Sequence, residues 1–116
     1  AVSAHARDDC WKAKSRAPAK CASSCCTLTA RVGGREITTI EGVAEEAAAF
    51  ARCMAAEGAE QCGFCTPGLT MTVLALRREL EAPDEEAINR YLAGNLCRCS
   101  GYAGQLRAIK TFLGVG

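Results

Sequence analysis

Apolar residues recur at helical spacing through the second half of the chain. A helix is predicted over residues 43–57 because its apolar side chains share one face: Val43, Ala47, Phe50, Ala51 and Met54. Gly58 follows as a suitable C-terminal stop. A second helix is predicted over residues 67–81, since Pro67 suits a first helical turn. Its apolar stripe consists of Leu69, Val73, Leu76 and Leu80.

Two further helices complete the pattern. Pro83 breaks the chain, and Asp84 can cap a third helix that extends to Ala93. A fourth helix is predicted to begin near Gly101 and Tyr102, with an apolar face formed by Leu106, Ile109 and Leu113. Residues 43–116 therefore read as one compact four-helix unit.

Residues 1–42 lack this periodicity and form a separate, incomplete segment in our division of the chain. They are basic on balance, whereas residues 43–116 are slightly acidic. Gly33 and Gly34 could turn a hairpin, and residues 35–40 resemble a short β-strand. Residues 11–24 show no period, and their Lys, Ala and Ser content predicts loop or disorder.

The composition excludes several classes of partner and of site. The 116 residues carry a net charge of +1, so we expect neither a nucleic-acid nor an anionic-membrane partner. No apolar run is long enough to span a bilayer. The first ten residues lack the apolar core of a signal peptide and indicate a processed or incomplete terminus. His5 is the only histidine, which leaves little material for histidine-based zinc or catalytic sites.

Nine cysteines are the most informative feature of the composition. Cys62 and Cys65 form a C-x2-C pair, and after 31 intervening residues Cys97 and Cys99 form a C-x-C pair. Each pair lies just before a predicted helix. The count is odd and no secretion signal is visible, so metal ligands are favoured over disulfides.

The spacing suits an anionic metal centre. Gly63 would let backbone N–H groups approach the sulfurs, and two helix N-termini would present partial positive charge to one site. Arg98, between the second pair, adds a full positive charge. Taken by themselves, these residues fit either a [2Fe–2S] cluster or a structural four-cysteine zinc ion.

The segments EQCGFCTPG and LAGNLCRCSGY closely resemble the iron–sulfur subunit of the molybdenum hydroxylases. This family includes xanthine dehydrogenase, aldehyde oxidoreductase and carbon monoxide dehydrogenase. TTIEG at residues 38–42 resembles the segment that leaves the family's first domain. The similarity extends from about Cys26 to the C-terminus.

The resemblance implies a mainly α-helical fold, in which a four-helix [2Fe–2S]-binding domain follows a truncated or divergent ferredoxin-like (β-grasp) segment. It implies that Cys62, Cys65, Cys97 and Cys99 hold the cluster. Gln61 and Cys99 would face the molybdopterin of a large partner subunit, and electrons would pass on to an FAD subunit or another acceptor.

The resemblance weakens before residue 27. The family's first domain holds a second [2Fe–2S] cluster through a C-x4-C-x2-C loop and a distant fourth cysteine. Cys26 aligns with that fourth ligand as a remnant, while Cys10, Cys21 and Cys25 lie at unsuitable spacings. Loss of the first cluster, truncation and a reading-frame error remain three open explanations.

The function expected from the sequence is electron transfer within a molybdenum-dependent oxidoreductase, with no substrate chemistry on this chain. The alternative is a zinc-binding interaction module that uses the same four cysteines. A cytoplasmic location is expected because free thiols and cluster assembly suit a reducing compartment. Export together with a partner is the alternative location.

Overall fold

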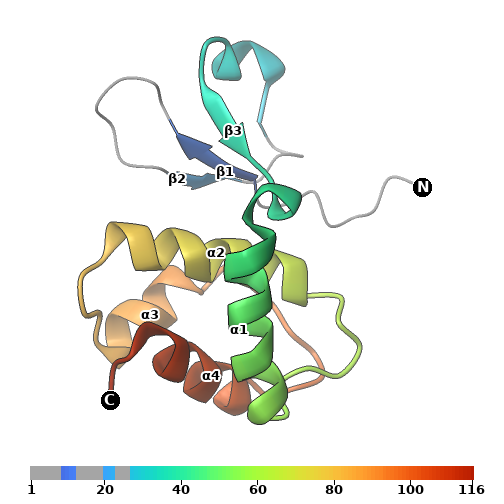
Figure 1. Ribbon diagram of the computed structural model, residues 1–116, viewed down its shortest axis with the longest axis vertical. Coiled ribbons are helices and arrows are strands. Elements are labelled where there is room, and N and C mark those ends of the chain that lie inside the picture. The colour runs from blue at the N-terminus through green and yellow to red at the C-terminus, as the bar shows by residue number, and fades with distance from the viewer. Residues whose placement is uncertain (1–8, 13–19, 23–26) are drawn as a thin grey trace.

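A computed structural model describes residues 9–12, 20–22 and 27–116 of the chain. Figure 1 shows a small sheet at one end of the molecule and four helices packed together at the other. The helices are α1 (Ala44–Ala56), α2 (Thr66–Glu79), α3 (Glu85–Tyr91) and α4 (Ala103–Leu113). The expected mainly helical class, with a short strand fragment ahead of four helices, is confirmed.

Helix α2 occupies the centre of the helical unit. Every residue from 69 to 76 is buried, which is more than a single stripe. The reason lies in the packing, since one cluster of buried residues holds Leu69, Val73 and Leu76 and a second holds Met71 and Leu74. Helix α2 is thus covered on more than one face.

The main core joins all four helices. Its fully buried members are Phe50 and Met54 of α1, Val73 and Leu76 of α2, Ile88 of α3, and Ala108 and Ile109 of α4. Phe50 and Phe112 meet edge to face, with ring centroids 5.3 Å apart. The apolar positions that the helical spacing selects on each helix therefore supply this core.

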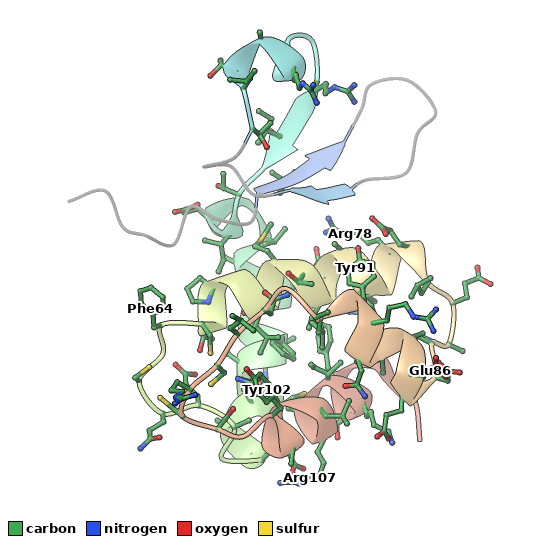
Figure 2. The ribbon with its side chains drawn as sticks, turned by 180° about the vertical axis from the view of Figure 1, so that it is seen from behind. Phe64, Arg78, Glu86, Tyr91, Tyr102 and Arg107 are labelled. Carbon is green, nitrogen blue, oxygen red and sulfur yellow. The ribbon has the colours of Figure 1, made fainter. Side chains whose placement is uncertain are left out.

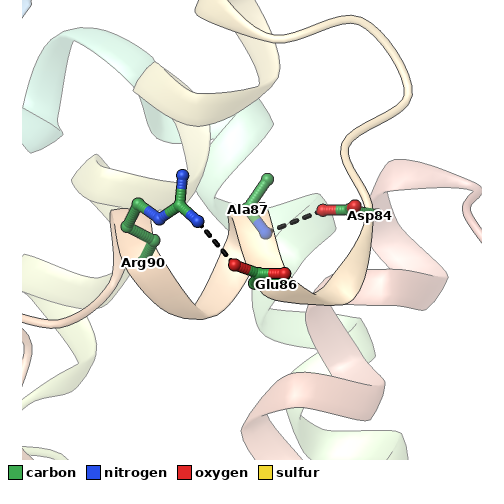
Figure 3. A network of polar contacts seen from close by, with 4 residues as sticks. All are labelled: Asp84, Glu86, Ala87 and Arg90. Atoms are coloured by element: carbon green, nitrogen blue, oxygen red, sulfur yellow. Dashed lines mark hydrogen bonds and ion pairs between the residues drawn. The ribbon is translucent and has the colours of Figure 1, made fainter.

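Single residues define the start of α3 and the end of α1. The Asp84 carboxylate accepts a hydrogen bond from the Ala87 N–H at 2.8 Å, so the expected N-cap of α3 is confirmed (Figure 3). Glu86 and Arg90 form an exposed ion pair one turn apart on the same helix (Figure 3). Gly58 adopts φ +57° directly after α1, as the predicted stop requires.

Several helix boundaries and faces differ from expectation. Val43 belongs to a 3-10 turn (Ile40–Val43) before α1, and Ala51 is exposed. Helix α2 ends at Glu79, because Leu80 has an extended backbone and lies partly in solvent. Helix α3 ends at Tyr91, two residues before the expected Ala93.

The N-terminal segment differs more. Strands β1 (Asp9–Lys12), β2 (Lys20–Ala22) and β3 (Glu36–Thr38) form one antiparallel sheet in the order β2-β1-β3. Strand β2 and the last two residues of β1 thus lie within the part expected to be loop, and the expected strand over residues 35–40 is reduced to three residues. The other residues of that expected loop lie outside the described part of the chain.

The expected hairpin at Gly33 and Gly34 is wrong. These glycines follow a 3-10 turn (Thr29–Val32), and β3 pairs with β1, where Cys10 faces Thr38. Strands of three or four residues are too short to show a clear alternation of apolar and polar positions in the sequence. The predicted boundary near Gly42 falls inside the 3-10 turn that leads into α1 and stays a prediction.

None of the helices in the described residues is long and apolar enough to cross a membrane.

Candidate metal centre

The first cysteine loop joins α1 to α2. Gly63 has φ +77°, and a Cβ atom there would lie 3.0 Å from the Glu60 carboxylate, so glycine is required. The Thr66 N–H donates to the Gly63 carbonyl at 3.3 Å, which closes the loop. Cys65 then stands at the N-cap of α2. The loop thus holds Cys62 and Cys65 at the positive end of a long helix.

The second cysteine loop joins α3 to α4 and is closed by its own side chains. The Cys97 N–H donates to the Tyr102 hydroxyl at 3.0 Å, and the Tyr102 N–H donates to Ser100 Oγ at 3.3 Å. Gly101 and Tyr102 both have positive φ, at 66° and 69°. This left-handed pair reverses the chain and starts α4 at Ala103, close to the expected start.

The two loops meet, and their thiols interact in crossed pairs. The side chains of Cys62 and Cys99 lie close enough to shift each other's pKa, and the side chain of Cys65 is in the same relation to that of Cys97. Figure 2 shows the sulfur atoms gathered at the end of the helical unit where Phe64 is labelled. Each pair therefore takes one cysteine from each loop.

Cys65 and Cys97 form the inner pair. Ser100 donates to Cys97 Sγ through its hydroxyl at 3.2 Å and through its N–H at 3.4 Å. The hydroxyl is the main reason that the pKa of Cys97 falls to about 7. Burial raises the pKa of Cys65, while Gln105 Nε2, which donates to Cys65 Sγ at 3.5 Å, opposes that rise.

Cys62 and Cys99 form the outer pair and are exposed. The backbone N–H of Phe64 is the main cause of a lowered pKa at Cys62. The Cys62 side chain raises the pKa of Cys99. The thiols thus divide into an inner pair that side chains support and an outer pair in contact with solvent.

A hollow of about 480 Å³ lies over the site. The four cysteines line it together with Arg98 and three largely exposed apolar or aromatic side chains, which are Phe64, Leu96 and Tyr102. Within the described part of the chain, no three Cys, His, Asp or Glu side chains surround one point closely enough to hold a single ion.

Comparison with known proteins identifies the family of the chain. Residues 39–110 match the [2Fe-2S] binding domain family. The chain belongs to this family. Among curated proteins, this [2Fe–2S]-binding chain is 45% identical over 92 residues to a probable xanthine dehydrogenase subunit of Bacillus subtilis, covering 77% of this chain and 52% of the relative. It is 42% identical over 82 residues to the nicotinate dehydrogenase small FeS subunit of Eubacterium barkeri, covering 69% and 52%.

A solved structure agrees with these relatives. The crystal structure of quinoline 2-oxidoreductase from Pseudomonas putida 86 superposes with a TM-score of 0.67 at 34% identity, covering 77% of this chain and 56% of that one. The [2Fe–2S]-binding chain spans about half the length of these relatives. The resemblance to iron–sulfur subunits is confirmed, and the chain is homologous to subunits of oxidoreductases.

The residues present fit a [2Fe–2S] cluster. Such a cluster binds two thiolates at each of two irons, whereas zinc binds four thiolates at one ion. Two crossed pairs match the first arrangement. The N-terminus of α2 and the exposed Arg98 offset the negative charge of four thiolates. Cys62, Cys65, Cys97 and Cys99 are thus the residues that would hold the group.

The other predicted site residues are Gly63, Arg98, Gln61 and Cys26. Gly63 shapes the first loop, and Arg98 lines the hollow, whereas Gln61 is exposed beside Cys62 and does not line it. Cys26 lies outside the described residues, and so do the contacts that would test it as a ligand of a further cluster.

Sequence reasoning missed Ser100, Tyr102 and Gln105 as site residues. Ser100 and Tyr102 are adjacent to the C-x-C pair, so their position in the motif was an available signal. Gln105 lies one helical turn further on, 40 residues from the cysteine to which it donates. No sequence motif marks Gln105. The one available signal is a polar side chain at a position on the buried face of α4.

Proposed function

We propose that this chain is the electron-transfer iron–sulfur subunit of a molybdenum hydroxylase. In this proposal it relays electrons from a molybdopterin centre in a large partner subunit to a flavin subunit or another acceptor. The observation that carries it is the crossed pairing of Cys62 with Cys99 and of Cys65 with Cys97. When bound there, a [2Fe–2S] cluster supplies reversible one-electron transfer.

The chain's own residues provide binding and orientation. The inner thiols are fixed by Ser100 and Gln105, while the outer thiols stand at the surface, where a partner can approach. Electron transfer needs a short distance between centres, and an exposed sulfur pair provides it. Cys99 and Gln61, which precedes Cys62 in the sequence, form the entry side in this proposal, consistent with the exposure of both.

The rim supports a protein partner. Phe64, Leu96 and Tyr102 are 57%, 77% and 46% exposed, and they surround the hollow over the cysteines. Exposed apolar side chains that gather around a site mark an interface more often than those scattered singly. We assign this rim to the molybdopterin subunit.

The names of the relatives add to the proposal. A xanthine dehydrogenase subunit and a nicotinate dehydrogenase small FeS subunit are both parts of larger dehydrogenases. The relatives differ in substrate, so the partner and not this chain sets the reaction. We therefore place no acid, base or nucleophile for substrate chemistry on this chain.

The test is the iron and acid-labile sulfide content of anaerobically purified chain, with an EPR spectrum after dithionite reduction. Two irons, two sulfides and one rhombic S = 1/2 signal per chain are expected. Zinc without sulfide would contradict the proposal and establish the structural zinc module. Four irons with two distinct signals would show a second cluster that involves residues 1–26.

A further inference from the structure

A buried amide on α4 faces the inner thiol pair. Gln105 is only 5% exposed, and its Nε2 donates to Cys65 Sγ at 3.5 Å. It belongs to the same buried face of α4 as Ala108 and Ile109, three and four residues later. The periodicity of that face favours an apolar side chain, so the amide is the exception.

Gln105 lines a cavity of about 190 Å³ whose walls are mostly apolar, among them Leu69, Leu106 and Ile109. The other polar side chains that line this cavity are Asn89, Asn95 and Tyr102. A polar group buried among apolar side chains destabilises the fold unless it is hydrogen-bonded. A neutral thiol is a weak acceptor, whereas a metal-bound thiolate carries charge and is a strong one. The amide is therefore best satisfied when Cys65 is a ligand.

Donors to the cysteine sulfurs act on the two redox states unequally. A [2Fe–2S] cluster held by these cysteines would take up one electron, which would reduce one of its two ferric ions without a change of proton or bond. The electron comes from the partner's molybdenum centre and leaves to the downstream acceptor. The added negative charge strengthens every hydrogen bond that a sulfur accepts, so a donor favours the reduced state.

We infer that Gln105 sets the reduction potential of the centre, by donating to Cys65 Sγ and raising the potential above the value that the cysteines alone would give. The inference rests on the proposed function, because it requires a [2Fe–2S] cluster on Cys65. By raising the reduction potential, Gln105 makes the centre accept electrons from the partner more readily.

The test compares Gln105→Met with wild type by redox titration of the reconstituted full chain, monitored by EPR. Methionine keeps the length of the side chain and removes the donor. We expect the reduced-to-oxidised ratio at a fixed poise to fall by about 3- to 10-fold, which is a potential about 30–60 mV more negative. Leu106→Met is the matched control, since it changes a neighbour that lines the same cavity and should leave the potential unchanged.

Other outcomes are equally informative. A Gln105→Met chain with two irons and an unchanged or more positive potential would overturn the inference and leave the proposed function intact. Gln105→Asn, which keeps the amide but shortens its reach, should also lower the potential. Its failure to do so would count against the inference too.

A measurement without substitution of Gln105 guards against variants that do not fold. The chain has two glutamines, Gln61 and Gln105. In a Gln61→Glu chain carrying ¹⁵N-labelled glutamine, pulsed EPR of the reduced state should detect coupling of the unpaired spin to the Gln105 side-chain nitrogen. Absence of that coupling in a sample with a normal S = 1/2 signal would overturn the inference, whereas absence of the S = 1/2 signal from wild type would instead refute the proposed function.

Discussion

Asn95 is tied to Thr72, 23 residues earlier in the chain. Asn95 Nδ2 donates to Thr72 Oγ1 at 3.1 Å, and Thr72 Oγ1 lies 3.0 Å from the Gly68 carbonyl to which it donates. Thr72 is buried in α2, the helix that begins beside Cys65, and Asn95 lies two residues before Cys97. This bond therefore connects α2, which begins beside the first cysteine loop, to the segment just before the second cysteine loop.

Removal of this connection should destabilise the fold and loosen the second loop. Asn95→Ala leaves Thr72 without this partner, and we expect a loss of about 1–2 kcal/mol in the free energy of unfolding. Urea denaturation of the chain measures it. The exposed Asn89 on α3 provides the control Asn89→Ala, expected to change stability by less than about 0.5 kcal/mol. Equal midpoints for the two variants would contradict the connecting role of Asn95.

Replacement of any one of the four paired cysteines by alanine should abolish normal cluster binding. Each of Cys62, Cys65, Cys97 and Cys99 would supply half of the protein ligands to one iron, so iron content should fall to less than about half of the wild-type value. Cys53→Ala is the control, because Cys53 packs against the core on α1. If the Cys53 variant also lost its iron, or a paired-cysteine variant kept two irons, the ligand assignment would be wrong.

In the metal-free chain, Cys97 should react with alkylating agents faster than Cys65 and Cys99 at neutral pH, because the pKa values of those two thiols are raised. Its pKa of about 7 makes it half thiolate at pH 7, compared with about one per cent for a thiol at the ordinary value of 9.0. Ser100→Ala removes the hydroxyl donor, so alkylation of Cys97 at pH 7 should slow by up to about tenfold. Peptide mapping after iodoacetamide treatment measures this, with Cys65, whose pKa is raised, as the slow internal reference.

The lowered pKa of Cys97 also determines how the stability of the metal-free fold depends on pH. The folded pKa of Cys97 lies below the unfolded value, so ionisation of this thiol stabilises the metal-free fold at pH values above the unfolded pKa. That contribution decreases as pH falls and is lost below about 7. A wild-type chain whose stability between pH 9 and 6 matched that of Ser100→Ala would argue against the hydrogen bond as its cause.

Leu96→Ser should weaken association with the molybdopterin subunit and leave the centre intact. Leu96 is 77% exposed on the rim of the hollow, so its loss removes apolar contact area without disturbing the core. Burial of a leucine side chain is typically worth about 1.5–3 kcal/mol, and we expect affinity to fall about tenfold or more. Leu80→Ser, at the far end of α2, is the control. Binding measured by gel filtration or calorimetry should change only for Leu96, with the EPR signal of both variants unchanged.

Much of the helical unit was predictable because its information is local. Apolar spacing selected Phe50, Met54, Val73 and Ile88, all of which are buried. The N-cap at Asp84 and the stop at Gly58 depend on single residues and their neighbours. Predictions failed where partners are distant, as in β1 and β2, whose pairing of Cys10 with Cys21 leaves no trace in either short segment.

The cysteine motifs by themselves identified the four candidate ligands, because C-x2-C and C-x-C place two sulfurs on each tight loop. Only the tertiary structure decided how these sulfurs combine, with Cys62 against Cys99 and Cys65 against Cys97. The packing of α4 brings Gln105 to Cys65 across 40 residues, and the packing of α2 brings Thr72 to Asn95. Such pairs depend on where helices cross, and the crossing follows from the fit of whole faces rather than from the identity of any neighbour in sequence.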